Sequence, residues 1–91
     1  MTDLSYIYIL TNNHNTTLYI GVTSNLPQRI FAHKEKINEG FSKQYNLTKL
    51  VYYEACSDIE QAILREKQLN GGSRQKKIDL IDRFNTEWLD L

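Results

Sequence analysis

Apolar and polar positions alternate along residues 5–11, and this period of two predicts a β-strand rich in tyrosine and isoleucine. One side of the strand carries Tyr6, Tyr8 and Leu10, and the other side carries Ile7 and Ile9. Residues 18–22 predict a second strand, and the turn-forming residues 12–15 between the two indicate a hairpin.

On the second strand Tyr19 and Gly21 share a side, opposite Leu18, Ile20 and Val22. A glycine inside a strand indicates a bulge or a group that approaches the backbone closely. Tyrosines on such strands are commonly ordinary core residues, so this pattern alone does not identify a site.

A helical period follows the hairpin. Ser24 or Asn25 is expected to cap a first helix that runs to about Glu39, where Gly40 supplies a helix-ending residue. A polar loop over residues 41–48 and a third strand over residues 50–56 come next.

Two further helices complete the pattern. Ser57-Asp58-Ile59-Glu60 matches a capping box and opens a helix that runs to about Asn70, before the break at Gly71-Gly72. Ser73 is expected to cap a last helix over roughly residues 74–83, and the tail over 84–91 to pack against the domain. The order ββαβαα predicts one α+β domain over residues 1–91, with a small three-stranded antiparallel or mixed sheet flanked by helices.

Composition excludes several classes of protein. A single cysteine, Cys56, leaves no internal disulfide and no cysteine zinc cluster. No apolar run approaches the roughly 20 residues of a membrane span, and Met1 to Leu4 contains no basic signal-peptide region. We therefore expect a cytoplasmic protein without a membrane partner.

The net charge is zero, but basic residues gather in two segments. Residues 28–49 include five basic and two acidic residues, and residues 65–83 include six basic and three acidic ones. If these segments pack side by side they form one basic face for nucleic acid; scattered, solvated charge is the alternative. The candidate DNA-binding residues are Lys34, Lys36, Lys43, Arg74, Lys76 and Lys77.

One carboxylate interrupts the apolar stripe of the second helix, which consists of Ile59, Ala62, Ile63 and Leu69. Glu66 lies on the same stripe, and burial of a carboxylate costs several kcal/mol unless it is paired or bound to a metal. An arginine or lysine partner is the structural explanation. A metal ligand or an acid/base group is the functional one.

The first helix carries a similar exception. His33 falls on its apolar face, and Arg29 lies one turn earlier at the edge of that face. A histidine in such a place is most often a core residue with its hydrogen bonds satisfied. Arg29 makes a functional site more plausible here, because a guanidinium binds phosphate or carboxylate through two hydrogen bonds.

Taken together, these residues resemble the motifs of the GIY-YIG nuclease superfamily, in the order Tyr6-Ile7-Tyr8, Tyr19-Ile20-Gly21, Arg29, His33, Glu66 and Asn85. The resemblance covers essentially the whole chain. It is closest to the small, single-domain bacterial members of the UvrC–intron (URI) type, for which Leu18–Thr23 and Arg65–Leu69 are typical.

The resemblance implies a metal-dependent endonuclease that hydrolyses DNA in a structure-directed way during repair or recombination, with Mg²⁺ or Mn²⁺ as cofactor. The implied roles are activation of water by Tyr8 or Tyr19, neutralisation of the scissile phosphate by Arg29, a site histidine at His33, a single metal ligand at Glu66, and support of the site by Asn85. Because the ordinary pKa of tyrosine is near 10, Arg29 and the metal would have to lower it.

A different class of function stays open. Asn70-Gly71-Gly72-Ser73 stands where relatives carry lysine and tryptophan, and the net charge is zero. Both observations favour a non-catalytic nucleic-acid-binding or interaction module that keeps the fold. In either case DNA is the expected partner. Without a second domain, binding is expected to be weak and directed by DNA structure, or to depend on a homodimer or a protein partner.

Overall fold

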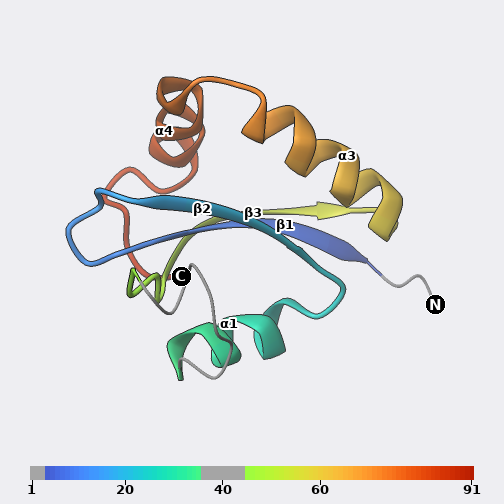
Figure 1. The fold of residues 1–91 in the computed structure, drawn as a ribbon, viewed down its shortest axis with the longest axis horizontal. Coiled ribbons are helices and arrows are strands. Elements are labelled where there is room, and N and C mark those ends of the chain that lie inside the picture. The colour runs from blue at the N-terminus through green and yellow to red at the C-terminus, as the bar shows by residue number, and fades with distance from the viewer. Residues whose placement is uncertain (1–3, 36–44) are drawn as a thin grey trace.

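A computed structural model describes residues 4–35 and 45–91 as one small sheet with helices on both of its faces (Figure 1). The elements in chain order are β1 (Ser5–Thr11), β2 (Leu18–Thr23), α1 (Leu26–Lys34), β3 (Lys49–Cys56), α3 (Ile59–Asn70) and α4 (Arg74–Phe84). This order confirms the predicted α+β fold. No helix in the described ranges has the length and apolar character that crossing a membrane requires.

The sheet has the order β2-β1-β3, and the central strand β1 is antiparallel to both neighbours. Tyr8 stands opposite Gly21 on β2 and opposite Tyr53 on β3. The pairing of β1 with β3 is interrupted between Ile9 and Leu10, where β3 contributes the extra residue Val51. Such a bulge changes which face the following residues occupy.

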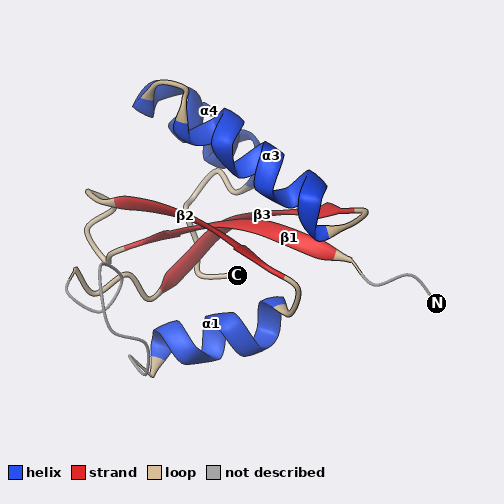
Figure 2. Ribbon diagram, turned by 45° about the vertical axis from the view of Figure 1, so that its right-hand side comes forward, coloured by secondary structure: helices blue, strands red, loops and turns tan. Residues whose placement is uncertain are grey.

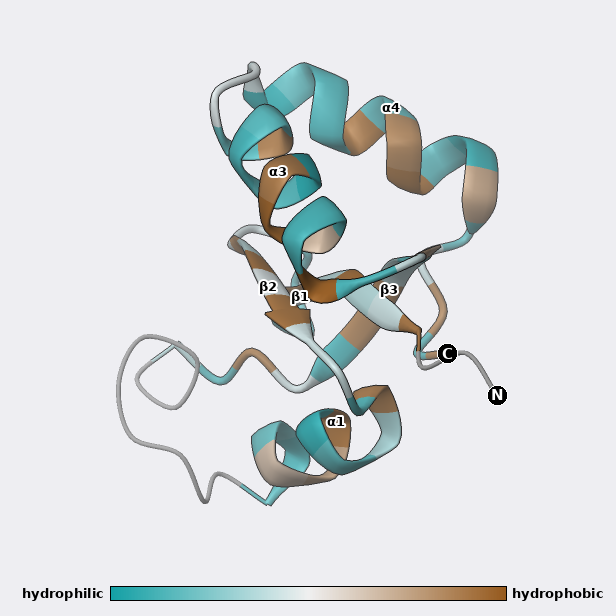
Figure 3. Ribbon diagram, turned by 90° about the vertical axis from the view of Figure 1, so that its right-hand side faces the viewer, coloured by the Kyte–Doolittle hydropathy of each residue, from teal (hydrophilic) through white to brown (hydrophobic). Residues whose placement is uncertain are grey.

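Two hydrophobic clusters lie on opposite faces of this sheet. Helices α3 and α4 cover one face and α1 covers the other (Figures 2 and 3). The first, here the α3–α4 face, combines strand residues such as Ile7, Ile9, Ile20 and Val51 with Ala62, Leu69 and Ile81 of the helices. The second, here the α1 face, combines Tyr8, Leu10, Ile30, Leu47 and Leu50. The predicted division of the β1 side chains between two faces is therefore confirmed.

The ends of the first helix partly match the prediction. The side chain of Asn25 caps α1 by accepting a hydrogen bond from the backbone N–H of Gln28 at 3.2 Å. The predicted end near Glu39 is wrong, because α1 ends at Lys34 with Glu35 as its C-cap. Gly40, the residue expected to end the helix, lies outside the described residues.

The predicted cap of α3 is displaced by one residue. Asp58, not Ser57, is the N-cap, and its carboxylate accepts a hydrogen bond from the backbone N–H of Gln61 at 2.9 Å. Aspartate and serine are comparable caps, so the sequence pattern alone could not choose between adjacent residues. The end of α3 before Gly71 and the capping of α4 by Ser73 are confirmed.

The C-terminal tail packs onto the domain, as predicted. The backbone N–H of Leu91 donates to the carbonyl of Leu50 at 2.9 Å, and Asp90 accepts from the N–H of Leu50 at 3.0 Å. Lys34 of α1 forms an ion pair with Asp90 and donates to the carbonyl of Thr48 at 3.0 Å. The tail therefore connects the start of β3 to α1.

Candidate active site

Three ring side chains meet on the α1 face. The hydroxyl of Tyr8 lies 3.1 Å from Nε2 of His33, and both residues are buried. The ring of Tyr19 lies 6.4 Å from that of Tyr8 and 6.0 Å from that of His33, measured between centroids. The structure thus brings together three of the predicted site residues from β1, β2 and α1.

Gly21 makes this arrangement possible. A Cβ atom at Gly21 would lie 2.3 Å from both Cζ and Oη of Tyr8, a distance that real Cβ contacts do not reach. The Tyr8 ring therefore lies directly over the backbone of its partner on β2. The expectation that a group approaches this glycine closely is confirmed, and that group is the ring whose hydroxyl meets His33.

Burial controls the protonation of the pair. Burial raises the pKa of Tyr8 to about 12, with a further increase from Tyr19, against the opposing charge of Arg29. Burial, and then the charge of Arg29, lower the pKa of His33 below its usual 6.5. The expected lowering of a tyrosine pKa by Arg29 is therefore outweighed at Tyr8. At neutral pH Tyr8 is therefore a phenol and His33 a neutral imidazole. The hydroxyl of Tyr8 can then donate a hydrogen bond to Nε2 of His33.

Arg29 stands at the solvent side of this group. Its side chain is exposed, and it lines a polar hollow where β2 passes into α1, together with Thr23, Asn25 and Gln28. An exposed guanidinium close enough to influence both Tyr8 and His33 electrostatically is suited to binding an anion beside them.

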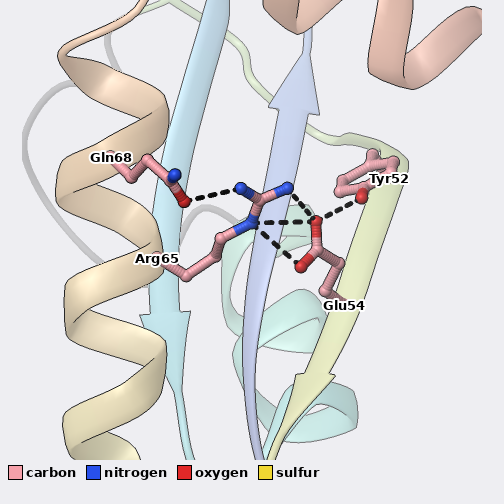
Figure 4. A network of polar contacts seen from close by, with 4 residues as sticks. All are labelled: Tyr52, Glu54, Arg65 and Gln68. Atoms are coloured by element: carbon pink, nitrogen blue, oxygen red, sulfur yellow. Dashed lines mark hydrogen bonds and ion pairs between the residues drawn. The ribbon is translucent and has the colours of Figure 1, made fainter.

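Glu66 belongs to α3, on the other side of the sheet. Successive helix residues turn by about 100°, so Arg65 and Glu66 flank the buried line of Ala62 and Leu69 on opposite sides. Arg65 extends across β1 toward Glu54 on β3 (Figure 4). Glu66 therefore lies on the flank directed away from β3, on the side of the edge strand β2.

The surroundings of Glu66 fit a metal ligand. This half-buried carboxylate forms no hydrogen bond or ion pair with any residue of the described ranges. The same ranges contain no group of three or more histidine, cysteine, aspartate or glutamate side chains that could hold a metal ion. A single carboxylate without a counter-cation fits a divalent ion that completes its shell with water and substrate phosphate.

Asn85 has a structural position. It is buried as the C-cap of α4, and its amide donates to the carbonyls of Val51 at 3.2 Å and Leu89 at 2.7 Å. Its side-chain oxygen accepts from the N–H of Leu89 at 3.0 Å. These bonds hold the tail in place and occupy the polar atoms that a direct role would need.

The candidate DNA-binding residues that the structure describes do not gather on one face. Lys34 on α1 and the basic residues of α4 lie on opposite sides of the sheet (Figure 1), so α1 and α4 do not form one basic face. Lys34 is paired with Asp90, and Arg74 donates to the carbonyl of Thr16 at 2.7 Å. Lys76 is exposed and Lys77 half-buried on α4. Lys36 and Lys43 lie outside the described residues.

Sequence reasoning missed a second polar group, on the α3–α4 face (Figure 4). Tyr52 donates a hydrogen bond to Glu54, which accepts bonds of 2.9–3.2 Å from the guanidinium of Arg65. Arg65 also donates to Gln68 at 2.7 Å. The period of two could have placed Tyr52 and Glu54 on one side of β3, but it gives no sign of the helix residue that meets them.

Comparisons with known proteins agree with these motifs. The model of the GIY-YIG catalytic domain matches residues 4–79. The chain is 34% identical to UPF0213 protein SH2523 of Staphylococcus haemolyticus over 85% of this chain and 93% of the relative. It is 33% identical to UPF0213 protein CPE1444 of Clostridium perfringens over 86% of this chain and 83% of the relative.

A solved structure extends the likeness to three dimensions. The solution NMR structure of the UPF0213 protein BH0048 from Bacillus halodurans matches with a TM-score of 0.54 and 26% identity. The match covers 87% of this chain and 83% of that one. With the family model matched over most of its length, the chain belongs to the GIY-YIG nuclease superfamily.

Proposed function

We propose that this protein is a metal-dependent endonuclease that hydrolyses DNA phosphodiester bonds. The observation that carries the proposal is the 3.1 Å contact between the hydroxyl of Tyr8 and Nε2 of a neutral His33, beside the exposed Arg29. Hydrolysis of a phosphodiester needs an acceptor for the proton of water and positive charge near the phosphate. These three side chains supply both.

The proton leaves the attacking water through Tyr8. With a pKa of about 12, Tyr8 is not a phenolate at neutral pH and does not act as a free base. Its proton instead passes to Nε2 of His33 while its oxygen accepts a proton from water. The resulting hydroxide attacks phosphorus, the bond to the leaving oxygen breaks, and that oxygen takes a proton from solvent. His33 ends the step as an imidazolium.

Arg29 and Glu66 supply charge at the phosphate. The exposed guanidinium of Arg29 binds the non-bridging oxygens, whose negative charge grows in the transition state. Glu66 would hold Mg²⁺ or Mn²⁺, which when bound supplies Lewis-acid stabilisation of the phosphate. Tyr19 lies beside both rings of the pair and orients the water from the less buried side of the group.

We further propose that cleavage depends on DNA structure and serves repair or recombination in the cytoplasm, with a homodimer or a protein partner adding specificity. The net charge of zero bears on one part of this proposal: it leaves little general attraction to duplex DNA, so binding would have to depend on DNA structure or on a partner.

The test is cleavage of nicked, branched and linear duplex DNA with Mg²⁺ or Mn²⁺ by the wild type and by Glu66→Gln, Arg29→Ala and His33→Ala variants. We expect each variant to lose about 100-fold or more of the cleavage rate. Lys67→Ala, one residue from Glu66 on α3, is the control for an exposed charge. Equal product from the wild type and Glu66→Gln, or no product from any substrate, contradicts the proposal.

A non-catalytic DNA-binding module is the second candidate. It is favoured by the position of Glu66 on the helix layer opposite Tyr8 and His33. The same experiment separates the two functions, because the module would bind these DNAs without cutting any of them.

A further inference from the structure

A basic groove is lined by residues of α3 and α4. These two helices lie on the same side of the sheet (Figure 1). Residues spaced three to four apart line it from each helix, among them Arg65 and Gln68 of α3 and Lys76, Asp79 and Arg83 of α4. This spacing places one face of each helix toward the groove. Tyr8 and His33 lie on the other face of the sheet, so the groove is separate from the Tyr8–His33 pair.

Two cations in this groove are available to a ligand. Lys76 and Arg83 form no ion pair with any carboxylate in the described part of the chain. Asp79 lies between them on α4 and accepts a hydrogen bond from Gln75 at 2.9 Å. The two cations therefore offer separate anion sites, one on each side of a carboxylate.

The third cation is fixed in place. Arg65 donates from Nε and one terminal nitrogen to Glu54 and from the other terminal nitrogen to Gln68. A guanidinium has five N–H groups, so two remain for a ligand. Because its orientation is already set, Arg65 loses little side-chain freedom when an anion binds.

Partly exposed aromatic rings lie at the end of α4, next in sequence to the groove residue Arg83. Phe84 follows Arg83 and is 48% exposed, and Tyr53 on the edge strand β3 is 37% exposed. The Phe84 ring lies edge-on to Tyr53 at 5.4 Å and to Tyr52 at 5.0 Å. Tyr52 also donates to Glu54, the partner of Arg65. The same polar group thus holds both the arginine and the aromatic surface.

We propose that a single strand of nucleic acid binds along this groove, with phosphates at Lys76 and Arg83 and a base stacked on Phe84. Single strands of nucleic acid bind surfaces where cations lie beside exposed aromatic rings. The rings stack on the flat faces of the bases, and the cations bind the negatively charged phosphates. The choice of a polynucleotide over another polyanion rests on the proposed function. The inference deepens it by assigning DNA with a single-stranded arm as the substrate class.

The test is the affinity of the protein for a labelled oligothymidylate of about 12 nucleotides, measured by fluorescence anisotropy without divalent metal. An abasic strand of the same length and a blunt duplex are the comparison ligands. We expect the oligothymidylate to bind roughly tenfold more tightly than the abasic strand, since stacking on an aromatic ring contributes that much. Equal binding of the two strands overturns the proposed stacking.

Variants locate the binding site. Lys76→Ala, Arg83→Ala and Phe84→Ala should each weaken oligothymidylate binding about tenfold, and Phe84→Tyr should restore it. Asp79→Asn should tighten binding about twofold by removing the groove's carboxylate. Lys67→Ala and Phe31→Ala remove an exposed cation and an exposed ring outside the groove. If these controls weaken binding as much as the groove variants do, the proposal is wrong.

Two outcomes distinguish binding in the groove from cleavage of DNA. A Glu66→Gln variant that loses cleavage but binds the oligothymidylate like the wild type separates the groove from catalysis. If the wild type cuts DNA while Lys76→Ala, Arg83→Ala and Phe84→Ala bind the oligothymidylate unchanged, the nuclease stands and the groove is overturned.

Discussion

The two faces of the sheet each hold a buried tyrosine with a pKa of about 12, but the tyrosines have different partners. On the α1 face, Tyr8 meets the neutral ring of His33, which can accept a proton. On the α3–α4 face, Tyr52 donates to Glu54, whose charge is already balanced by Arg65 (Figure 4). A raised tyrosine pKa therefore marks burial, and the partner decides whether the hydroxyl can take part in chemistry.

The electrostatics of the second group explain its stability. Burial alone would raise the pKa of Glu54, but hydrogen bonds from Arg65 and Tyr52 and the charge of Arg65 hold it below its usual value. Burial and then the bond to Glu54 raise the pKa of Tyr52 to about 12. Tyr52 and Arg65 both donate hydrogen bonds to Glu54, which among the described residues has no neutral proton acceptor beside it, whereas the Tyr8–His33 pair has Arg29 and Tyr19 beside it.

The largest expected effect comes from Gly21→Ala. The added Cβ would collide with the Tyr8 ring, so the ring must leave His33 or the strands must separate. We expect a loss of about 1–3 kcal/mol in the free energy of unfolding, and a fall in cleavage of at least about 100-fold. Urea unfolding and a cleavage assay measure both.

Gly72→Ala is the control for stability. A Cβ there lies 3.4 Å from the nearest atom, the carbonyl oxygen of Leu69, which is ordinary contact. Its free energy of unfolding should change by less than about 0.5 kcal/mol. If Gly21→Ala is as stable as Gly72→Ala, the close approach of Tyr8 does not exist in solution.

The next effect compares the two tyrosines directly. Tyr8→Phe should reduce cleavage about 100-fold because the relay to His33 is lost. Tyr52→Phe should leave the cleavage rate within about twofold and cost about 1 kcal/mol of stability, the value of one hydrogen bond. Single-turnover cleavage rates and urea midpoints of both variants provide the comparison. Equal loss of cleavage in the two would remove the distinction between the faces.

A smaller effect concerns the ion pair of the α3–α4 face. Glu54 and Arg65 are 28% and 30% exposed, so screening by solvent limits their interaction. A double-mutant cycle of Glu54→Gln and Arg65→Met should give a coupling energy of about 1 kcal/mol from urea unfolding. Lys34 with Asp90, a more exposed pair, provides the reference cycle. A coupling energy near zero would show that the ion pair of Glu54 and Arg65 adds nothing to the stability of the fold.

The smallest effect is the pH dependence that His33 contributes. Because folding lowers the pKa of His33 below 6.5, the unfolded chain binds its proton more readily. Stability should therefore fall as the pH drops from 6.5 toward the folded pKa. His33→Gln should reduce this slope, whereas His14→Gln, in the exposed turn, should keep it. Urea midpoints across this range test the expectation, and an unchanged slope in His33→Gln contradicts it.

Local pattern was enough to predict the layers of the fold. The period of two assigned Tyr8 and Ile7 to opposite faces, and the glycine at 21 indicated a close approach that the Tyr8 ring makes. Both follow from the pleat of a strand and the missing side chain of glycine. Pattern alone could not fix the end of α1, since Lys34 and the residues after it are equally helix-compatible.

The long-range pairs could not be predicted in the same way. The sequence suggested a cationic partner for a carboxylate on α3, but the structure pairs Arg65 of that helix with Glu54 of β3 and leaves Glu66 without one in the described ranges. Which carboxylate meets the arginine depends on how α3 crosses the sheet, which no local period encodes. The hydrogen bonds of Asn85 likewise require the folded tail.

The contact of Lys34 with Asp90 also has a consequence for the order of synthesis. These residues are 56 positions apart, and every strand and helix described here precedes Asp90 in the chain. On the ribosome, α1 and its Arg29 would therefore emerge long before the tail that joins this helix to β3. A nascent chain can form the hairpin early, but the lysine on α1 finds its partner only after every strand and helix described here has left the exit tunnel.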